Sequence, residues 1–297
     1  MTVRFVRPVS QSAYTGRRLG FSALLLFVII VIGHRFGPLS EPTFVALLLL
    51  SATIATAALL FSLIGLVRLW QAGARGGIAA AKGLIYAAIP LGTVAVAAYD
   101  YRHFPALYEV STDLEDPPAW IAAPKADQGW LARRATLGPA DRRAQFSAYP
   151  TLIGRRYEGA IDRVYDGVQK AARAARITIT GRQGIELIVP ETPGRTAPRD
   201  DQTPVPDVAP VPLPRPEPAP TPVYGNAGDV LLQGETRTLV LGLRFDLVIR
   251  LHEDAETTSV DIRVSSRYAD HDLGIGERIA ETFLDRLDQE LLGIAGN

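Results

Sequence analysis

Three long apolar stretches occupy the first hundred residues of the chain, at residues 19–33, 43–67 and 83–99, and no comparable stretch follows. A helix needs about 20 apolar residues to cross the hydrocarbon core of a bilayer. The middle stretch has 25 residues without a charge and meets this requirement alone. The sequence therefore predicts a three-helix transmembrane region over residues 1–99, with the lipid bilayer as its first partner.

The two outer stretches allow other interpretations. The first has only 15 apolar residues behind a basic segment, as in a cleaved signal peptide, although Gly33-His34-Arg35-Phe36 does not resemble a cleavage site. The third contains Pro90 and could be a buried helix of a soluble domain. Its small residues favour close helix packing in lipid instead. They are Gly83, Ala87, Ala88, Gly92, Ala95 and Ala97.

Basic residues predict the orientation of these helices, because cytoplasmic loops carry the excess of Arg and Lys. The segment before the first stretch has 4 such residues, the first loop has 1 and the second loop has 3. The N-terminus and the second loop are therefore predicted to be cytoplasmic. We expect a bacterial inner-membrane protein whose region after residue 99 is periplasmic. The residues counted are Arg4, Arg7, Arg17, Arg18, Arg35, Arg68, Arg75 and Lys82.

Composition excludes some functions for the region after residue 99. The formal net charge is zero, which favours no nucleic-acid partner, and the absence of cysteine excludes disulfides and thiol chemistry. Residues 100–148 are predicted to be an extended lead-in. Residues 190–222 hold 12 of the 22 prolines and cannot form a helix or a central strand. A disordered loop, or a recognition arm in polyproline II conformation, is expected there.

The remaining sequence has an α+β pattern. Apolar residues recur at helical spacing over residues 157–176 and 276–292. Strands are predicted at residues 177–180, 185–189, 238–251 and 259–266. The order α-β-β-β-β-α predicts a four-stranded antiparallel sheet with two helices on one face, within a domain spanning residues 149–292.

The last two predicted strands form a hairpin centred between residues 255 and 256. This register places Arg250 opposite Asp261, Val248 opposite Arg263 and Asp246 opposite Ser265. Alternation directs these polar residues away from the helices, onto a face expected to be uncovered. Two interpretations remain open: a solvated face held by cross-strand charge pairs, or a binding surface whose arginines contact phosphate or carboxylate groups.

Several of these segments resemble the family of the domain of unknown function 1499. They are Tyr149-Pro150, Ala174-Ala175-Arg176, residues 245–250, residues 260–267 and Asp272-Leu273-Gly274. The chain departs from the family pattern at Leu247, Ala269 and His271, and by its proline-rich insertion. The resemblance covers residues 149–292, implies a small α+β domain and implies no activity. It draws attention to Asp246, Arg250, Asp261, Arg263, Ser265, Ser266, Arg267 and Asp272.

Catalytic and metal-binding motifs are weak. Asp270-His271-Asp272 offers three neighbouring ligand types, but no second cluster is spaced to complete a metal site, so we predict that Asp270 or Asp272 caps the last helix. Ser265 or Ser266 with His271 supplies triad residue types without a nucleophile elbow. Gly274-Ile275-Gly276 is too short for a phosphate loop.

These observations favour a non-enzymatic membrane protein that needs no cofactor. Its periplasmic domain is predicted to bind an anionic small molecule, a lipid headgroup or a membrane-protein partner, or to organise the envelope. A hydrolase or metal-dependent enzyme acting on envelope substrates is one alternative. A structural subunit of a membrane complex is the other.

Overall fold

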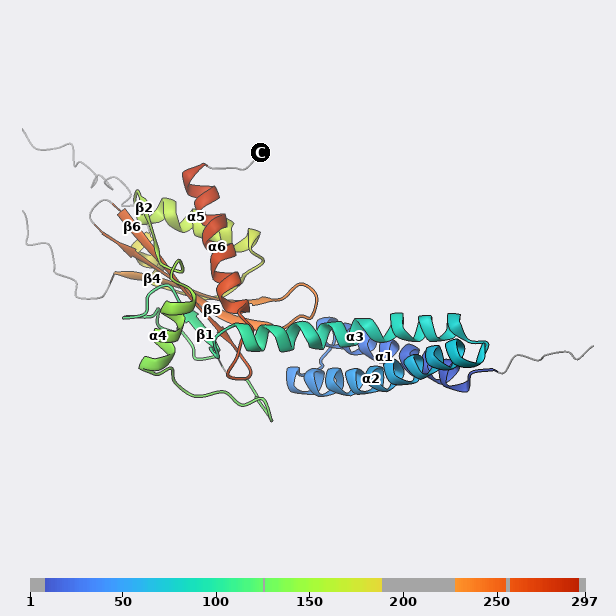
Figure 1. The fold of residues 1–297 in the computed structure, drawn as a ribbon. Helices are drawn as coiled ribbons and strands as arrows, with labels where there is room; N and C mark the ends of the chain where they lie inside the picture. Colours follow the sequence, from blue (N-terminus) through green and yellow to red (C-terminus); the bar gives the residue numbers. More distant parts are fainter. Residues whose placement is uncertain (1–8, 125, 189–227, 255–256, 294–297) are drawn as a thin grey trace, which may run out of the picture.

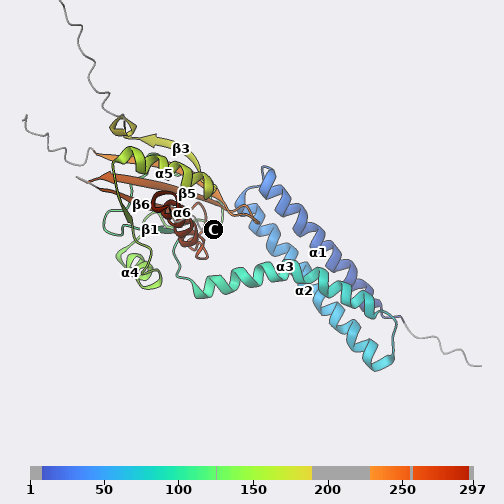
Figure 2. The ribbon, with the colours of Figure 1, turned by 90° about the horizontal axis from the view of Figure 1, so that it is seen from above.

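The computed structural model describes residues 9–124, 126–188, 228–254 and 257–293. An elongated bundle of three helices leads into an α+β domain, and the third helix makes the connection (Figures 1 and 2). Arg4 and Arg7, on which the predicted orientation partly depends, lie outside the described residues. The proline-rich segment 190–222 lies outside them as well.

The bundle consists of α1 (Gln11–Phe36), α2 (Glu41–Ala72) and α3 (Gly77–His103). All three are long and apolar enough to cross a membrane. The hydroxyl of Ser10 caps the start of α1, and α2 ends at Gly73, which has a φ of 59° that favours glycine. α3 continues past Tyr99, where the third stretch was expected to end, and contains Pro90.

Small side chains form the contacts between these helices. Ala23, Ala55, Ala58 and Ala87 form one buried cluster, one or two residues from each helix. A Cβ atom on Gly20 would lie 2.8 Å from the carbonyl oxygen of Gly83 in α3, so the two backbones approach closely. Gly83 and Ala87 therefore pack as predicted, whereas Ala88, Gly92 and Ala95 face outward. Close packing of small residues is the contact that holds helices together where no hydrophobic effect acts between them, as in lipid.

The second region is built on one antiparallel sheet. Its strands are β1 (Glu109–Ser111), β2 (Arg155–Glu158), β3 (Thr178–Gln183), β4 (Asp229–Arg237), β5 (Arg244–Glu253) and β6 (Thr257–Ser266). The order is β1-β6-β5-β4-β3, and β2 shares the β6 edge with β1. The helices are α4 (Pro139–Ala148), α5 (Ile161–Ala174) and α6 (Ile275–Leu292), with a 3₁₀ turn, η1, at Ile185–Ile188.

The α+β architecture and the antiparallel sheet are confirmed, but the prediction of four strands was wrong. The segment 185–189 does not form the second strand, because its described part folds as η1 after Gly184, which has a φ of 76°. β4 takes that place beside β3 and was missed, and the predicted strand 238–251 begins only at Arg244, as β5, because residues 238–243 form the loop between β4 and β5. β1 and β2 were missed because each has no more than four residues, too few to show an alternating pattern.

One hydrophobic core lies between the sheet and the pair α5 and α6 (Figure 1). From β5 and β6 it receives Phe245, Leu247, Ile249, Leu251, Val260, Ile262 and Val264. The opposite side of the sheet, here called the outer face, lies beneath residues 112–124 and 126–137, here called the cover segment, which contacts it at Arg250 and Ser265. The lead-in is therefore part of the domain: it contributes β1, the cover segment and α4.

Candidate functional site

The predicted hairpin register is confirmed. Asp246 pairs with Ser265, Val248 with Arg263 and Arg250 with Asp261 across β5 and β6. The outer face, however, is not uncovered as we expected. Val248 is fully buried, and Asp246 and Ser265 are buried as well. Because the cover segment crosses this face, the charged residues predicted to meet solvent or a ligand have partners inside the protein.

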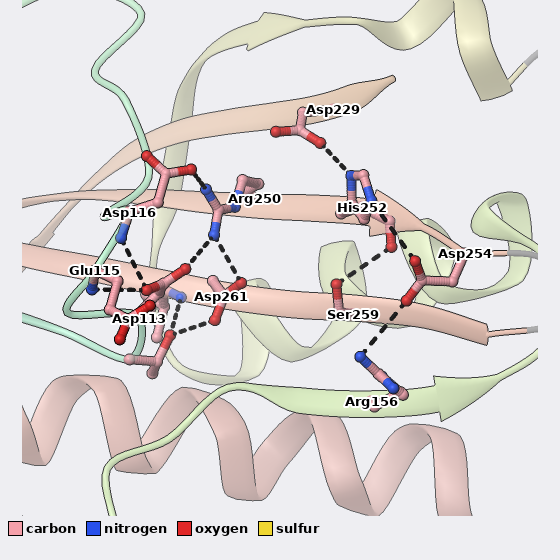
Figure 3. A network of polar contacts seen from close by, with 12 residues as sticks. Asp113, Glu115, Asp116, Arg156, Asp229, Arg250, His252, Asp254, Ser259 and Asp261 are labelled. Atoms are coloured by element: carbon pink, nitrogen blue, oxygen red, sulfur yellow. Dashed lines mark hydrogen bonds and ion pairs between the residues drawn. The ribbon is translucent and has the colours of Figure 1, made fainter. Parts of the chain in front are cut away.

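Arg250 lies at the centre of the first cluster (Figure 3). Its Nη2 atom is 2.8 Å from Asp113 and 3.1 Å from Asp261, and its Nη1 atom is 2.9 Å from Asp116. Asp113 and Asp116 belong to the cover segment, so Arg250 joins that segment to the hairpin. The side chain of Arg250 is only 11% exposed and is surrounded by three carboxylates. It has no charge left to offer an anionic ligand.

The pKa shifts of Arg250 and Asp113 support the role of Arg250 in joining the cover segment to the hairpin. Burial alone would disfavour the charged guanidinium, but hydrogen bonds to Asp261 and Asp113 raise the pKa of Arg250 above its usual range. Burial also opposes ionisation of Asp113, yet hydrogen bonds from the Asp116 amide and from Arg250 keep the pKa of Asp113 below its usual value. Both groups are therefore held in their charged forms.

The two ends of the outer face carry further internal pairs. Toward the helical bundle, Arg267 contacts Asp246 at 2.6 Å and Glu235 at 2.7 Å, and these bonds raise the pKa of Arg267 although burial opposes this rise. At the far end, His252 Nδ1 lies 2.6 Å from Asp229 (Figure 3). A pocket of about 470 Å³ there is lined by carboxylates and arginines together, which favours neither charge of ligand.

Arg263 belongs to a different site. Its Nη2 atom is 2.8 Å from Glu109 of β1, its Nη1 atom donates to the Pro118 carbonyl, and its guanidinium lies 5.1 Å from the ring centroid of Trp120. The Nε atom of Arg263 is buried and has no hydrogen-bond partner among the described residues. Arg263 therefore keeps one free donor beside an aromatic wall.

A pocket of about 340 Å³ opens beside Arg263, between the outer face, the cover segment and α4. We call it the arginine pocket. Its apolar wall comes from Tyr108, Leu114, Pro117, Trp120 and Leu137, and its polar wall from Glu109, Ser111, Arg133, Arg142, Gln145 and Arg263.

Three observations make the arginine pocket a candidate binding site. Arg133 and Arg142 have no carboxylate within 4 Å among the described residues, so two positive charges remain uncompensated. The Ser111 hydroxyl is buried and has no hydrogen-bond partner among the described residues, and Ser111 as a whole is only 5% exposed. The Arg133 guanidinium is held in place over Tyr108 and donates to Ser265 Oγ at 2.6 Å.

Asp270, His271 and Asp272 point to three different places. Asp270 pairs with Arg134, whereas Asp272 accepts hydrogen bonds from the Gly274 and Gly276 amides at the start of α6, at 2.8 and 2.9 Å. Asp272 thus accepts from amides of the first turn, while the N-cap residue itself is Gly274. Burial nevertheless raises the pKa of Asp272. No group of three metal-ligating side chains occurs among the residues that the structure describes.

His271 connects the domain to the bundle. Its Nε2 atom lies 3.1 Å from the carbonyl oxygens of Tyr101 and Phe104, and its Nδ1 atom accepts from the Leu273 amide. These partners require the proton on Nε2. The imidazole also stacks on Tyr101 at the end of α3. Since Ser265 and Ser266 bond elsewhere, the serine and histidine residues are not assembled as a triad.

Sequence reasoning missed the partners that complete these sites: Glu109, Asp113, Asp116, Arg133 and Arg142. All lie in the lead-in, where no periodicity assigns a face to any residue. The one signal available in the sequence was the high density of charged residues near a tryptophan. Trp120 and Trp130 make different contacts. Trp120 lies against the Arg263 guanidinium, and Trp130 donates to the Pro42 carbonyl at the start of α2.

Comparison with known proteins agrees with this enlarged domain. No curated protein and no solved structure matches the chain. A family model begins at β1, well before the residue 149 predicted from the resemblance, and so includes the cover segment and α4. On that match, over residues 109–287, the chain belongs to the family of proteins of unknown function DUF1499.

Proposed function

We propose that the α+β domain is a non-catalytic binding module, held at a membrane by the three helices, that takes a small anionic molecule into the arginine pocket. The observation that carries this proposal is the pair of uncompensated guanidinium groups of Arg133 and Arg142 beside a buried, unpartnered Ser111 hydroxyl. The two guanidinium groups have no carboxylate to balance their charge, and a buried hydroxyl without a hydrogen-bond partner is costly, so an anionic ligand that meets all three groups binds favourably.

The chemistry of the walls limits the ligand. Arginine groups recognise carboxylate or phosphate through paired hydrogen bonds, and Trp120 and Tyr108 suit a flat or apolar body. The volume of about 340 Å³ lies at the lower end of the range for small-molecule sites. A small carboxylate or phosphate ester with an apolar group meets these conditions.

We place this binding in the periplasm of a bacterium, with the N-terminus of the chain in the cytoplasm. The unequal distribution of basic residues among the loops supports that orientation. A reporter enzyme fused after residue 293 and active only outside the cytoplasm should be active. Activity of the complementary, cytoplasm-only reporter would contradict the proposed location without affecting the proposed pocket.

The binding test uses the full chain in detergent micelles, with phenyl phosphate, benzoate and inorganic phosphate as probes. Phenyl phosphate should bind most tightly, because it alone combines a doubly charged anion with a ring. Trp120 fluorescence reports binding, and native mass spectrometry reports any molecule retained from the cell. Absence of probe binding together with a bare mass would overturn the proposal, and a retained protein would favour a structural subunit.

Matched variants separate the pocket from the rest of the surface. Arg142→Met should weaken phenyl phosphate binding, whereas Arg143→Met, the neighbouring arginine that does not line the pocket, should not. His271→Ala and Ser266→Ala should also leave the affinity unchanged. Loss of binding in the His271 variant alone would favour the enzyme alternative.

A further inference from the structure

A second hollow lies on the side of the domain that faces the helical bundle, and no residue of the cover segment lines it. It measures about 660 Å³ and lies between the β4–β5 loop, the end of α5 and the first turns of α6. Its apolar wall comes from the loop and from α6, through Leu239, Val240, Leu241, Leu243, Ile275 and Ile279. Four arginines rim it: Arg176, Arg237, Arg278 and Arg286.

This rim carries uncompensated positive charge. No carboxylate lines the hollow, and none lies within 4 Å of these four arginines in the described part of the chain. Arg278 is partly engaged by the Gly274 and Leu273 carbonyls, whereas Arg176 and Arg237 are exposed. The hollow therefore combines an apolar floor with a cationic edge, a combination that fits an amphipathic anion.

The loop between β4 and β5 reaches the level of the membrane helices. Arg35 near the end of α1 donates to the Thr238 carbonyl at 3.3 Å. Leu241 and Leu243 pack against a cluster of Ile30, Phe44 and Leu48 inside the bundle. At the tip, Leu239 is 61% exposed and Val240 is 73% exposed. These two side chains belong to a loop that packs on helices long and apolar enough to cross a membrane, and in lipid the exposure of apolar side chains carries no cost.

We infer that this hollow is a binding site for one anionic phospholipid, whose acyl chain follows the β4–β5 loop and whose phosphate meets the arginine rim. The apolar floor is continuous with the membrane bundle, which favours a lipid over a soluble ligand. Basic residues at a membrane surface attract anionic lipid. The inference rests on the membrane location in the proposed function but not on its binding site, because the hollow shares no residue with the arginine pocket.

The test places the full chain in phosphatidylcholine nanodiscs that contain equal amounts of either photoactivatable phosphatidylglycerol or photoactivatable phosphatidylcholine. Cross-links are located by mass spectrometry. We expect phosphatidylglycerol to label residues 238–243 preferentially. The double variant Arg237→Ala/Arg286→Ala should weaken this labelling about 30-fold, because each lost arginine lowers it about fivefold, which corresponds to about 1 kcal/mol.

The control is Arg163→Ala/Arg182→Ala, which removes the same charge from exposed arginines away from the hollow. Equal labelling by both lipids, or equal losses in the two double variants, would overturn the inference. Suppression of labelling by inorganic phosphate would also overturn it, because the rim would then be a site for soluble phosphate. Leu239→Ser/Val240→Ser, which keeps every arginine, should reduce labelling as well.

Discussion

Arg250 and Arg263 lie on neighbouring strands of the same outer face, yet the two arginines have opposite surroundings. Arg250 meets three carboxylates, Asp113, Asp116 and Asp261. Arg263 shares its pocket with two more arginines and a single carboxylate, Glu109. The first cluster has an excess of negative charge and the second an excess of positive charge.

The cover segment creates this difference. It supplies two aspartates above Arg250 and one arginine, Arg133, above Ser265 near Arg263. Strand residues of one type therefore serve as a structural tie in one place and as a candidate ligand contact in the other. An arginine on an outer face is informative about binding only once the residues that cover it are known.

The largest effect should follow Arg250→Met. This change leaves three aspartates around an uncharged side chain, and loss of one partner from a largely buried ion cluster costs about 3 kcal/mol. Denaturant unfolding of the full chain in micelles, followed by tryptophan fluorescence, measures the loss. Arg156→Met, at an exposed ion pair with Asp254, should cost under about 1 kcal/mol. Equal losses would remove the distinction between the two kinds of arginine.

Arg133→Met should weaken ligand binding more than it lowers the free energy of unfolding. Loss of charge-assisted hydrogen bonds should weaken phenyl phosphate binding by about 2 kcal/mol, or roughly 30-fold, while the free energy of unfolding changes by about 1 kcal/mol. Titration of the full-length variant measures the first quantity and denaturant unfolding the second. A variant that binds normally but unfolds easily would make Arg133 another structural tie.

Low pH should destabilise the protein through the Arg250 cluster. The pKa of Asp113 lies below its ordinary value of 3.8 in the folded protein, so Asp113 contributes stability above that value and loses it as pH falls through the folded pKa. Thermal unfolding between pH 7 and pH 3 should therefore show a loss below about pH 4. Asp113→Asn should be less stable at pH 7 and flatter below pH 4; an unchanged slope would contradict the assignment.

Trp120→Leu should produce the smallest effect. The cation–π contact with Arg263 is worth about 0.5–1 kcal/mol, so phenyl phosphate affinity should fall about two- to fivefold. Trp130→Leu, at the cover-segment tryptophan that donates to the Pro42 carbonyl of α2, serves as the control and should bind normally. An equal loss in both variants would point to a general loosening of the domain.

The hairpin illustrates how far sequence reasoning reached. The register of β5 and β6 and the core face of Phe245, Leu247 and Ile249 were predicted correctly, because a strand repeats every two residues and the turn sets the pairing. β4 and the covered outer face were not predicted. The lead-in has neither helical nor strand periodicity, so nothing in it indicates which surface it crosses.

The sequence by itself determined the three apolar helices, the presence of an antiparallel α+β domain and the family, because these depend on local periodicity, apolar length and short motifs. Tertiary structure alone decided which charges are satisfied. Asp113 lies 137 residues from Arg250, and Arg133 lies 132 residues from Ser265. Whether an arginine is neutralised or available depends on groups within about 4 Å of it in space, and contacts across such separations are set by the packing of the whole domain.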